Sequence, residues 1–315
     1  MFRFLVQRVL YGALTLWVVT TATFLLIQAA PGGPAILADP KLGPVERHAI
    51  EVRLGLDQPL GIRYLTWHRN VARGDFGRSF LYQTPAIDTI RGRLPNTVLL
   101  TGLALVAALG FAMPLAVAVG RRPGGWLDRS LAAINFTTLA IPAFWFGIVL
   151  ILLVAARWRL LPAGGMSTPG LEDDMVDRLR HLVLPVLVLA LPLASEVFRY
   201  ARSGVIAGRR APHLTPARAR GLRERGVEWR HVVRNTLVSL LTVVGLQVPL
   251  LVGGAAVTET VFSWPGMGRL GVEAALGRDY PMVMAITVIV AVTVVGANLL
   301  IDLLYGLADP RVRLA

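Results

Sequence analysis

The chain has 315 residues, of which 55% are hydrophobic and only 16% are charged. Soluble domains carry about a quarter charged residues, so this composition indicates a membrane protein. The absence of cysteine excludes disulfides and thiol chemistry. The net charge of +13 is carried by arginine, with Lys41 as the single lysine. Such a charge suits either a nucleic-acid partner or basic loops beside a membrane.

Six stretches of the chain lack charged residues and are candidates for membrane helices. They cover residues 9–30, 94–120, 130–156, 181–195, 235–258 and 280–301. A bilayer core of ~30 Å needs ~20 apolar residues per helix, and all but the fourth stretch meet that length. The fourth continues past Glu196 and contains Pro185 and Pro192, which a membrane helix tolerates when neighbours satisfy the freed carbonyls. The sequence predicts an all-α membrane protein with six transmembrane helices.

The arginines indicate how these helices are oriented. With the N-terminus inside, the inner segments 1–8, 120–129, 199–235 and 308–315 carry a net charge of +13. The outer segments 31–93, 157–180 and 259–279 carry only +2. Positive charge is enriched in cytoplasmic loops, so we expect both termini in the cytoplasm, contact with membrane lipids, and no nucleic-acid partner.

The outer segment 31–93 is too apolar for a solvated linker, with Leu54, Leu60, Ile62 and Trp67 among its residues. We therefore expect it to form an extracytoplasmic helical insertion. The inner segment 199–235 carries ten arginines, and short helices are expected near 196–207 and 215–224. Thr215 followed by Pro216 is a typical helix start, and Gly221 a typical stop. Such a helix could dock on a partner, or the loop could only fix topology beside anionic lipid.

No constellation of catalytic residues is evident. The five histidines are not spaced as metal ligands of the H-E-x-x-H kind, and no G-x-S-x-G or P-loop motif occurs. We expect no catalytic residue, no metal site and no cofactor on this chain, and hence no enzyme.

Three polar residues within apolar stretches are candidates for a translocation path: Glu196, Gln247 and Thr258. Glu196 could instead pair with Arg199 or Arg202. Gln247 and Thr258 lie in a stretch rich in small residues, so close helix packing is the alternative interpretation.

Several motifs, in order along nearly the whole chain, resemble those of one family, the permeases of dipeptide, oligopeptide and nickel ABC importers (B-type subunits). They are FLVQRVL near the N-terminus, LGLDQPLGIRYL (54–65), GDFGRSF (74–80), RLPNT (93–97), IPAFWFGIVLIL (141–152), LPAGG (161–165), ETVFSWPGMGRL (259–270), RDYP (278–281) and NLLIDLLYGLADPRVR (298–313).

The resemblance implies a role for the third inner loop, because in this family it carries the EAA-type motif of the coupling helix that docks on the ATPase. Aligned on its glycine, the motif spans Thr215 to Gly221 here, and it departs from the family pattern D-Y-V-R-T-A-R-A-K-G before Ala217. The ATPase-coupling residues implied are Thr215, Ala217, Ala219, Gly221 and Leu222.

The resemblance also implies an architecture and partners. The fold would be the type I ABC importer transmembrane domain, with 1–315 as one permease domain that includes 31–93 and the coupling loop 199–235. The partners would be a second homologous permease, two ATPase subunits that hold ATP and magnesium, and a periplasmic or lipid-anchored solute-binding protein. An ion-coupled secondary transporter is the alternative, but it would need more ionisable groups at mid-membrane.

Overall fold

The structure is a computed structural model that describes residues 2–30, 33–37, 42–211, 214, 226 and 228–308; in some helical stretches, including 248–254, it describes only the backbone. The chain divides into two compact units. The first unit combines residues 1–96 with 265–296, and the second combines residues 97–264 with 297–315.

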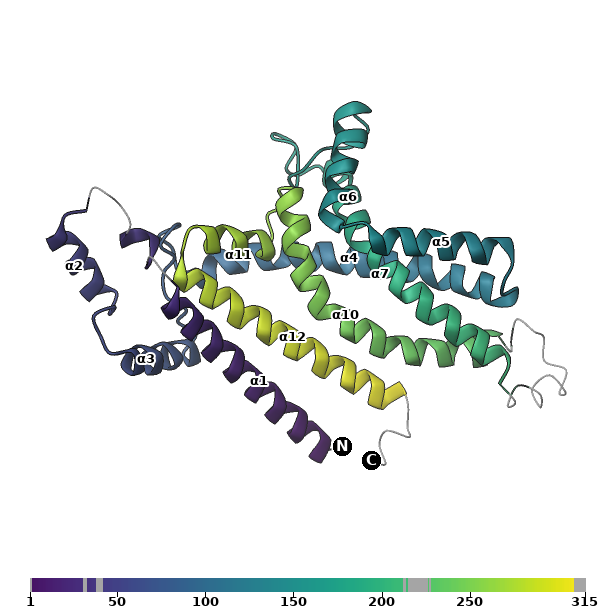
Figure 1. Ribbon diagram of the computed structural model, residues 1–315, viewed down its shortest axis with the longest axis horizontal. Helices are drawn as coiled ribbons and strands as arrows, with labels where there is room; N and C mark the ends of the chain where they lie inside the picture. The colour runs from purple at the N-terminus through teal and green to yellow at the C-terminus, as the bar shows by residue number, and fades with distance from the viewer. Residues whose placement is uncertain are drawn as a thin grey trace. The chain divides into compact units, whose positions relative to one another are not determined.

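Helices account for nearly all regular structure in the described residues (Figure 1). They are α1 (Phe2–Ala29), η1 (Ala35–Leu37), α2 (Pro44–Arg53), α3 (Leu60–Ala72), α4 (Ala86–Arg121), α5 (Trp126–Ala140), α6 (Ala143–Leu150), η2 (Ile151–Arg157), α7 (Met175–Arg209), η3 (Glu228–Val233), α10 (Arg234–Val261), α11 (Met267–Leu276) and α12 (Tyr280–Ala308). Among these residues the only β pairing is an isolated bridge between Arg78 and Pro85. The predicted all-α class is confirmed.

In the first unit, α1 and α12 lie side by side (Figure 1). Gly12 permits this approach, since a Cβ there would lie 2.7 Å from a methyl carbon of Val295. Helix α3 is held on α1 by a hydrogen bond of 2.8 Å between the hydroxyls of Thr21 and Tyr64. The ring of Phe24, which is buried, meets the ring of Tyr64 edge-on at 5.5 Å. Helices therefore form in the 31–93 segment, as its apolar residues predict.

The second unit is organised around a stripe of small residues on α4. Leu100, Ala104, Ala108, Ala112 and Ala116 recur at every fourth position and are all buried. Residues four apart share a helix face, and small side chains let another helix approach closely. Leucine, valine and phenylalanine side chains of α7 fill the same core, so α4 and α7 form the centre of this unit.

The third predicted span is broken. The sequence predicts one helix over 130–156, but the structure has α5 and then α6, with a bend of 99° between Trp126–Ala140 and Ala143–Arg157. Ile141 is extended, with φ −90° and ψ 124°, because Pro142 disfavours the helical conformation of the residue before it. A count of charges alone misses this break.

Helix α7 is longer than expected. It starts at Asp174, whose carboxylate accepts a hydrogen bond from the N–H of Val176, and it continues through Pro185 and Pro192 to Arg209. The separate short helix predicted near 196–207 is therefore wrong, because these residues form the last turns of α7.

Four helices of the described chain are long and apolar enough to cross a membrane: Val6–Ala29, Ala86–Arg121, Met175–Arg209 and Tyr280–Leu303. The bent pair formed by α5 with α6 and η2 gives a fifth if it counts as one span. Helix α10 covers the predicted span 235–258, but part of its side chains lie outside the description. The count of six stays a prediction.

Candidate functional site

The predicted docking residues Thr215, Ala217, Ala219, Gly221 and Leu222 lie outside the described residues. The structure describes the chain on either side of them. Helix α7 ends at Arg209 before the docking segment, and η3 begins at Glu228 after it. Both positions belong to one group of charged side chains.

Glu228 is the centre of this group. Its carboxylate is buried and accepts hydrogen bonds from Arg121, at the end of α4. Nε of Arg121 donates to both carboxylate oxygens at 3.1 Å, and Nη2 donates to Oε2 at 2.5 Å. Nη1 of Arg209 donates to Oε1 at 2.8 Å. The hydrogen bonds from Arg121 lower the pKa of Glu228, although burial opposes the shift. The carboxylate is therefore held ionised between two guanidinium groups.

A second buried carboxylate lies at the start of α5. The carboxylate of Asp128 accepts hydrogen bonds from Nε and Nη2 of Arg202 at 2.5 and 2.6 Å. It also accepts a hydrogen bond from the N–H of Gly124 at 2.8 Å. We call Arg121, Asp128, Arg202, Arg209 and Glu228 the charged cluster. It connects the end of α4 and the start of α5 to α7 and η3, the two elements that flank the predicted docking residues.

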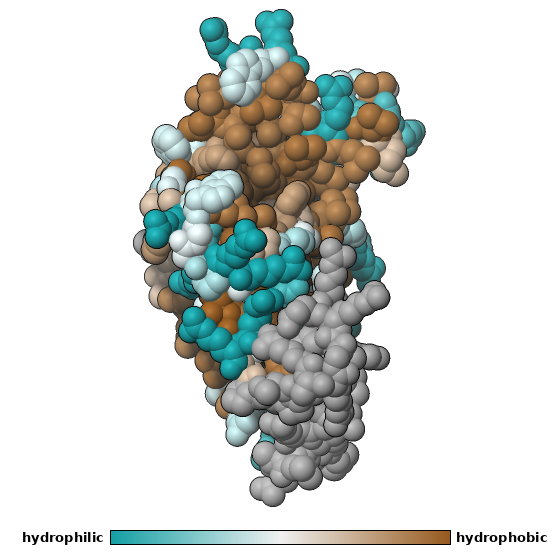
Figure 2. All heavy atoms as spheres, turned by 90° about the vertical axis from the view of Figure 1, so that its right-hand side faces the viewer, coloured by the Kyte–Doolittle hydropathy of each residue, from teal (hydrophilic) through white to brown (hydrophobic). Residues whose placement is uncertain are grey.

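Apolar side chains support the charged cluster from within the second unit. Val117, Val205, Leu214, Val232 and Val233 form a small buried core beside it. On the face drawn in Figure 2, hydrophobic side chains cover much of the upper part, and hydrophilic side chains gather below them and at the top edge. This separation suits a boundary between lipid and water.

The three candidate path residues have different surroundings. Glu196 forms an ion pair of 3.0 Å with Arg199, whereas Arg202 binds Asp128 instead. Gln247 is half-buried on α10. Thr258 is buried, and its hydroxyl has no hydrogen-bond partner among the described residues. Gln247 and Thr258 are eleven residues apart, about three helical turns, so they share one face of α10.

Sequence reasoning missed the carboxylate next to Thr258. Glu259 is fully buried and accepts a hydrogen bond of 2.6 Å from the hydroxyl of Thr97 on α4. Glu259 opens the ETVFSW motif, which could have marked it as a site residue, but the search for uncharged stretches placed it in the predicted outer segment 259–279. Thr258 and Glu259 together place polar groups inside the second unit.

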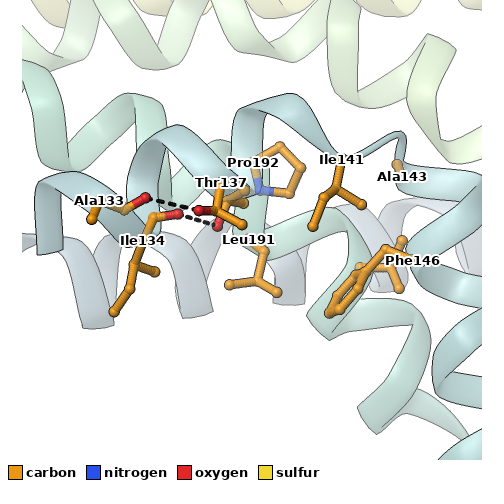
Figure 3. Close-up of a pocket in the computed structure, with 10 residues that line it drawn as sticks. Ala133, Ile134, Thr137, Ile141, Ala143, Phe146, Leu191 and Pro192 are labelled. Carbon is orange, nitrogen blue, oxygen red and sulfur yellow. Dashed lines mark hydrogen bonds between the residues drawn. The ribbon is translucent and has the colours of Figure 1, made fainter. Parts of the chain in front are cut away.

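An apolar cavity of 270 Å³ lies where α5 bends into α6, against α7 (Figure 3). Its hydroxyls belong to Thr137 and Thr138, which donate to the carbonyls of Ala133 and Ile134 at 3.0 and 2.9 Å. No ionisable side chain lines this cavity among the described residues, so it offers no group for acid–base chemistry. In the described part of the chain, no three His, Cys, Asp or Glu residues gather as metal ligands.

Two family profiles cover almost the whole sequence. One, described as "Binding-protein-dependent transport system inner membrane component", matches residues 112–314. Another, described as "Binding-prot-dependent transport system membrane comp, N-term", matches residues 1–101.

Individual relatives are similar over their full length. The oligopeptide transport system permease protein AppB of Bacillus subtilis (strain 168) is 38% identical over 98% of this chain and 99% of its own. The dipeptide transport system permease protein DppB of Escherichia coli (strain K12) is 33% identical over 99% of each chain. A chain of the MetNI methionine ABC transporter, in an inward-facing conformation, superposes with a TM-score of 0.57 at 16% identity. It covers 71% of this chain and 97% of that chain, and this likeness concerns the fold.

Proposed function

We propose a function from one premise: this chain belongs to the family of binding-protein-dependent transport system inner membrane components. It is a multi-pass inner-membrane permease of an ABC importer, with the fold of a type I importer permease. The solutes that we assign to it are peptides. The observation that carries this assignment is full-length similarity to permeases named for oligopeptides and dipeptides.

The remaining parts of the importer are proposed from the family membership, and the absence of an ATP-binding motif in this sequence supports assigning ATP to partner subunits. ATP and magnesium would bind two partner ATPase subunits, a solute-binding protein would deliver the peptide, and this chain would hold no cofactor and catalyse no reaction. A second, similar permease would complete the pathway. Peptide would cross by alternating access, in which closure of the ATPases reorients the helices.

ATPase motion would enter through residues 215–222, with Gly221 ending the docking helix. The charged cluster supports this assignment, because ion pairs of the buried carboxylates of Asp128 and Glu228 join the elements that flank the segment, α7 and η3, to α4 and α5. A movement of residues 215–222 would thus be transmitted to α7 and α10. Gln247 and Thr258, on one face of α10, would line the path.

The rival function is ion-coupled secondary transport, which needs ionisable groups free to bind the coupling ion. The observed pairings disfavour it. Asp128 and Glu228 bind arginines, and Glu196 binds Arg199. The relatives named as permeases of peptide transport systems also favour the ABC importer.

Both termini would lie in the cytoplasm. Single cysteines at Thr66 and Ser167 should react with an impermeant maleimide in intact cells. A cysteine at Gly226 should react only after the membrane is opened. External reaction at position 226 would contradict this orientation.

The central experiment compares Gly221→Asp with Gly226→Asp, a matched control in the same loop. Gly226 is exposed, and a Cβ there would have no heavy atom within 4 Å. We expect Gly221→Asp to abolish co-purification of the ATPases or peptide-stimulated ATP hydrolysis, and Gly226→Asp to retain both. Ala219→Glu should behave like Gly221→Asp. Normal peptide uptake by Gly221→Asp with ATPases bound would refute the docking assignment.

A further inference from the structure

A second, larger cavity lies within the first unit and has a volume of 670 Å³. It is open on one side and is lined by the last turns of α1, by residues 34–36, by α2 and the turn after it, by α3, by residues 77–83, and by the start of α12. Sites for small ligands have volumes of about 300–1,000 Å³, so its size is that of a binding site. It lies at the ends of α1 and α12 that the charge distribution predicts to be extracytoplasmic.

The charged side chains that line this cavity are all positive among the described residues. Arg53, Arg63 and Arg78 line it, and no aspartate or glutamate is among its described lining residues. Arg78 donates to the carbonyl of Gln83 at 2.8 Å. The guanidinium groups of Arg53 and Arg63 have no ion-pair or hydrogen-bond partner in the described part of the chain. Burial lowers the pKa of Arg63, because a partly desolvated guanidinium loses hydration, and an anion in the cavity would compensate for that loss.

The rest of the lining suits a peptide rather than a bare inorganic anion. Amide side chains, which both donate and accept hydrogen bonds as peptide groups do, are supplied by Gln28, Gln58 and Asn70. Flat apolar surface comes from the rings of Trp67, Phe80 and Tyr280. Guanidinium groups match a carboxylate, amides match a peptide backbone, and aromatic rings match apolar side chains.

The walls of the cavity are fixed before any ligand binds. Asp279, fully buried before α12, accepts hydrogen bonds from the hydroxyl of Ser79, from the N–H of Leu81 at 3.1 Å and from the N–H of Met282 at 3.3 Å. The opposite wall, α3, is held on α1 by the contact between Tyr64 and Thr21. A preformed site loses little conformational entropy when it binds.

We propose that this cavity binds the carboxyl terminus of a short peptide, with Arg53, Arg63 and Arg78 facing the carboxylate. This inference rests on the proposed peptide function and assigns it a recognition site on the permease itself. The described lining offers no carboxylate to an ammonium group. The site therefore distinguishes peptides by their C-terminus and is indifferent to the N-terminus.

The test measures peptide binding to the full chain, purified with its accompanying subunits but without the binding protein, in phosphatidylcholine nanodiscs. The probes are the tripeptide alanyl-phenylalanyl-leucine, its C-terminal amide and its N-acetyl derivative, titrated calorimetrically. We expect the amide to bind about tenfold more weakly, since a charged hydrogen-bonded pair is lost, and the acetylated peptide to bind like the parent. Equal binding of the free acid and the amide, or no saturable binding, would overturn the proposal.

Variants locate the site. Arg63→Gln should weaken binding of the free peptide about tenfold and abolish the difference between acid and amide. Arg69→Gln, on the same helix but outside the cavity, is the matched control and should bind like the wild type. Arg53→Gln is the second variant if Arg63→Gln misfolds, because Arg53 is exposed. A weakened Arg69→Gln, or unchanged Arg53→Gln and Arg63→Gln, would overturn the proposal.

Anionic lipid is the competing source of a negative group. Replacing part of the phosphatidylcholine by phosphatidylglycerol should leave the peptide isotherm unchanged, and competition would assign the cavity to lipid headgroups instead. Peptide uptake by cells that lack this chain tests the proposed function separately. If these cells lose peptide uptake but the purified protein binds the free acid and the amide equally, the proposed function stands and the proposed site is overturned. If these cells still take up peptide, the proposed function is overturned.

Discussion

Removing the carboxylate of Glu228 should loosen the second unit at the docking segment. The side chain of Glu228 is only 4% exposed, while those of Arg121 and Arg209 are 48% and 29% exposed. Hydrogen bonds to charged groups contribute about 1.5–3 kcal/mol, and exposure of the arginines reduces their share. We expect Glu228→Gln to lower the free energy of unfolding by about 2 kcal/mol. Arg121→Gln should lower it by only about 1 kcal/mol, because Arg209 still neutralises the carboxylate.

The assay is equilibrium unfolding of the purified chain in mixed detergent micelles, with both single variants and the double variant. Because Arg121 and Glu228 share hydrogen bonds, the double variant should be only about as unstable as Glu228→Gln, which gives a coupling of about 1 kcal/mol. Peptide-stimulated ATP hydrolysis by the reconstituted complex should fall in parallel. Strictly additive effects, or a loss below about 0.5 kcal/mol for Glu228→Gln, would refute the reasoning.

Three further predictions concern pH, packing and the path. The folded-state pKa of Glu228 lies below its ordinary value, so the stability that its carboxylate contributes is complete above about pH 4.3 and is lost as the pH falls through the folded pKa. The difference in free energy of unfolding between the wild type and Glu228→Gln should therefore disappear at low pH when unfolding is measured across an acid titration. Gly164→Ala would place a Cβ against the backbone carbonyl oxygen of Phe262 and should lower the free energy of unfolding by about 1–3 kcal/mol, whereas Gly102→Ala, with open space around it, should be near neutral by the same unfolding assay. Cysteines at Gln247 and Thr258 should react with a small water-soluble thiosulfonate in one nucleotide state and be protected in another; protection in every state would indicate packing alone.

Much of the fold could be predicted because apolar length is a strong signal in membrane proteins. The stretches 94–120 and 280–301 correspond to α4 and α12, since lipid requires every backbone polar group to be paired within a helix. Local backbone chemistry caused the errors. Pro142 breaks the third stretch without adding a charge, and α7 continues unbroken to Arg209 where the sequence predicted a separate short helix near 196–207.

The candidate site was harder to predict because its contacts join distant residues. Glu228 and Arg121 are 107 positions apart, and Asp128 and Arg202 are 74 apart, so no local spacing reveals either pair. The sequence offered either Arg199 or Arg202 as the partner of Glu196, and the structure pairs Glu196 with Arg199 and Arg202 with Asp128. The arginine-lined cavity combines six segments, none of which stands out in composition by itself.

The anchoring of Ser79 by Asp279 has a consequence for biogenesis. The two residues are 200 positions apart, and ribosomes deliver the chain from its N-terminus. Residues 77–83 are therefore synthesised long before Asp279, whose carboxylate holds Ser79 in the folded protein. This part of the 31–93 segment therefore lacks its partner until the last helix, α12, has been made. Contacts of such long sequence separation form late, so truncation before α12 should leave this segment open to proteases and chaperones.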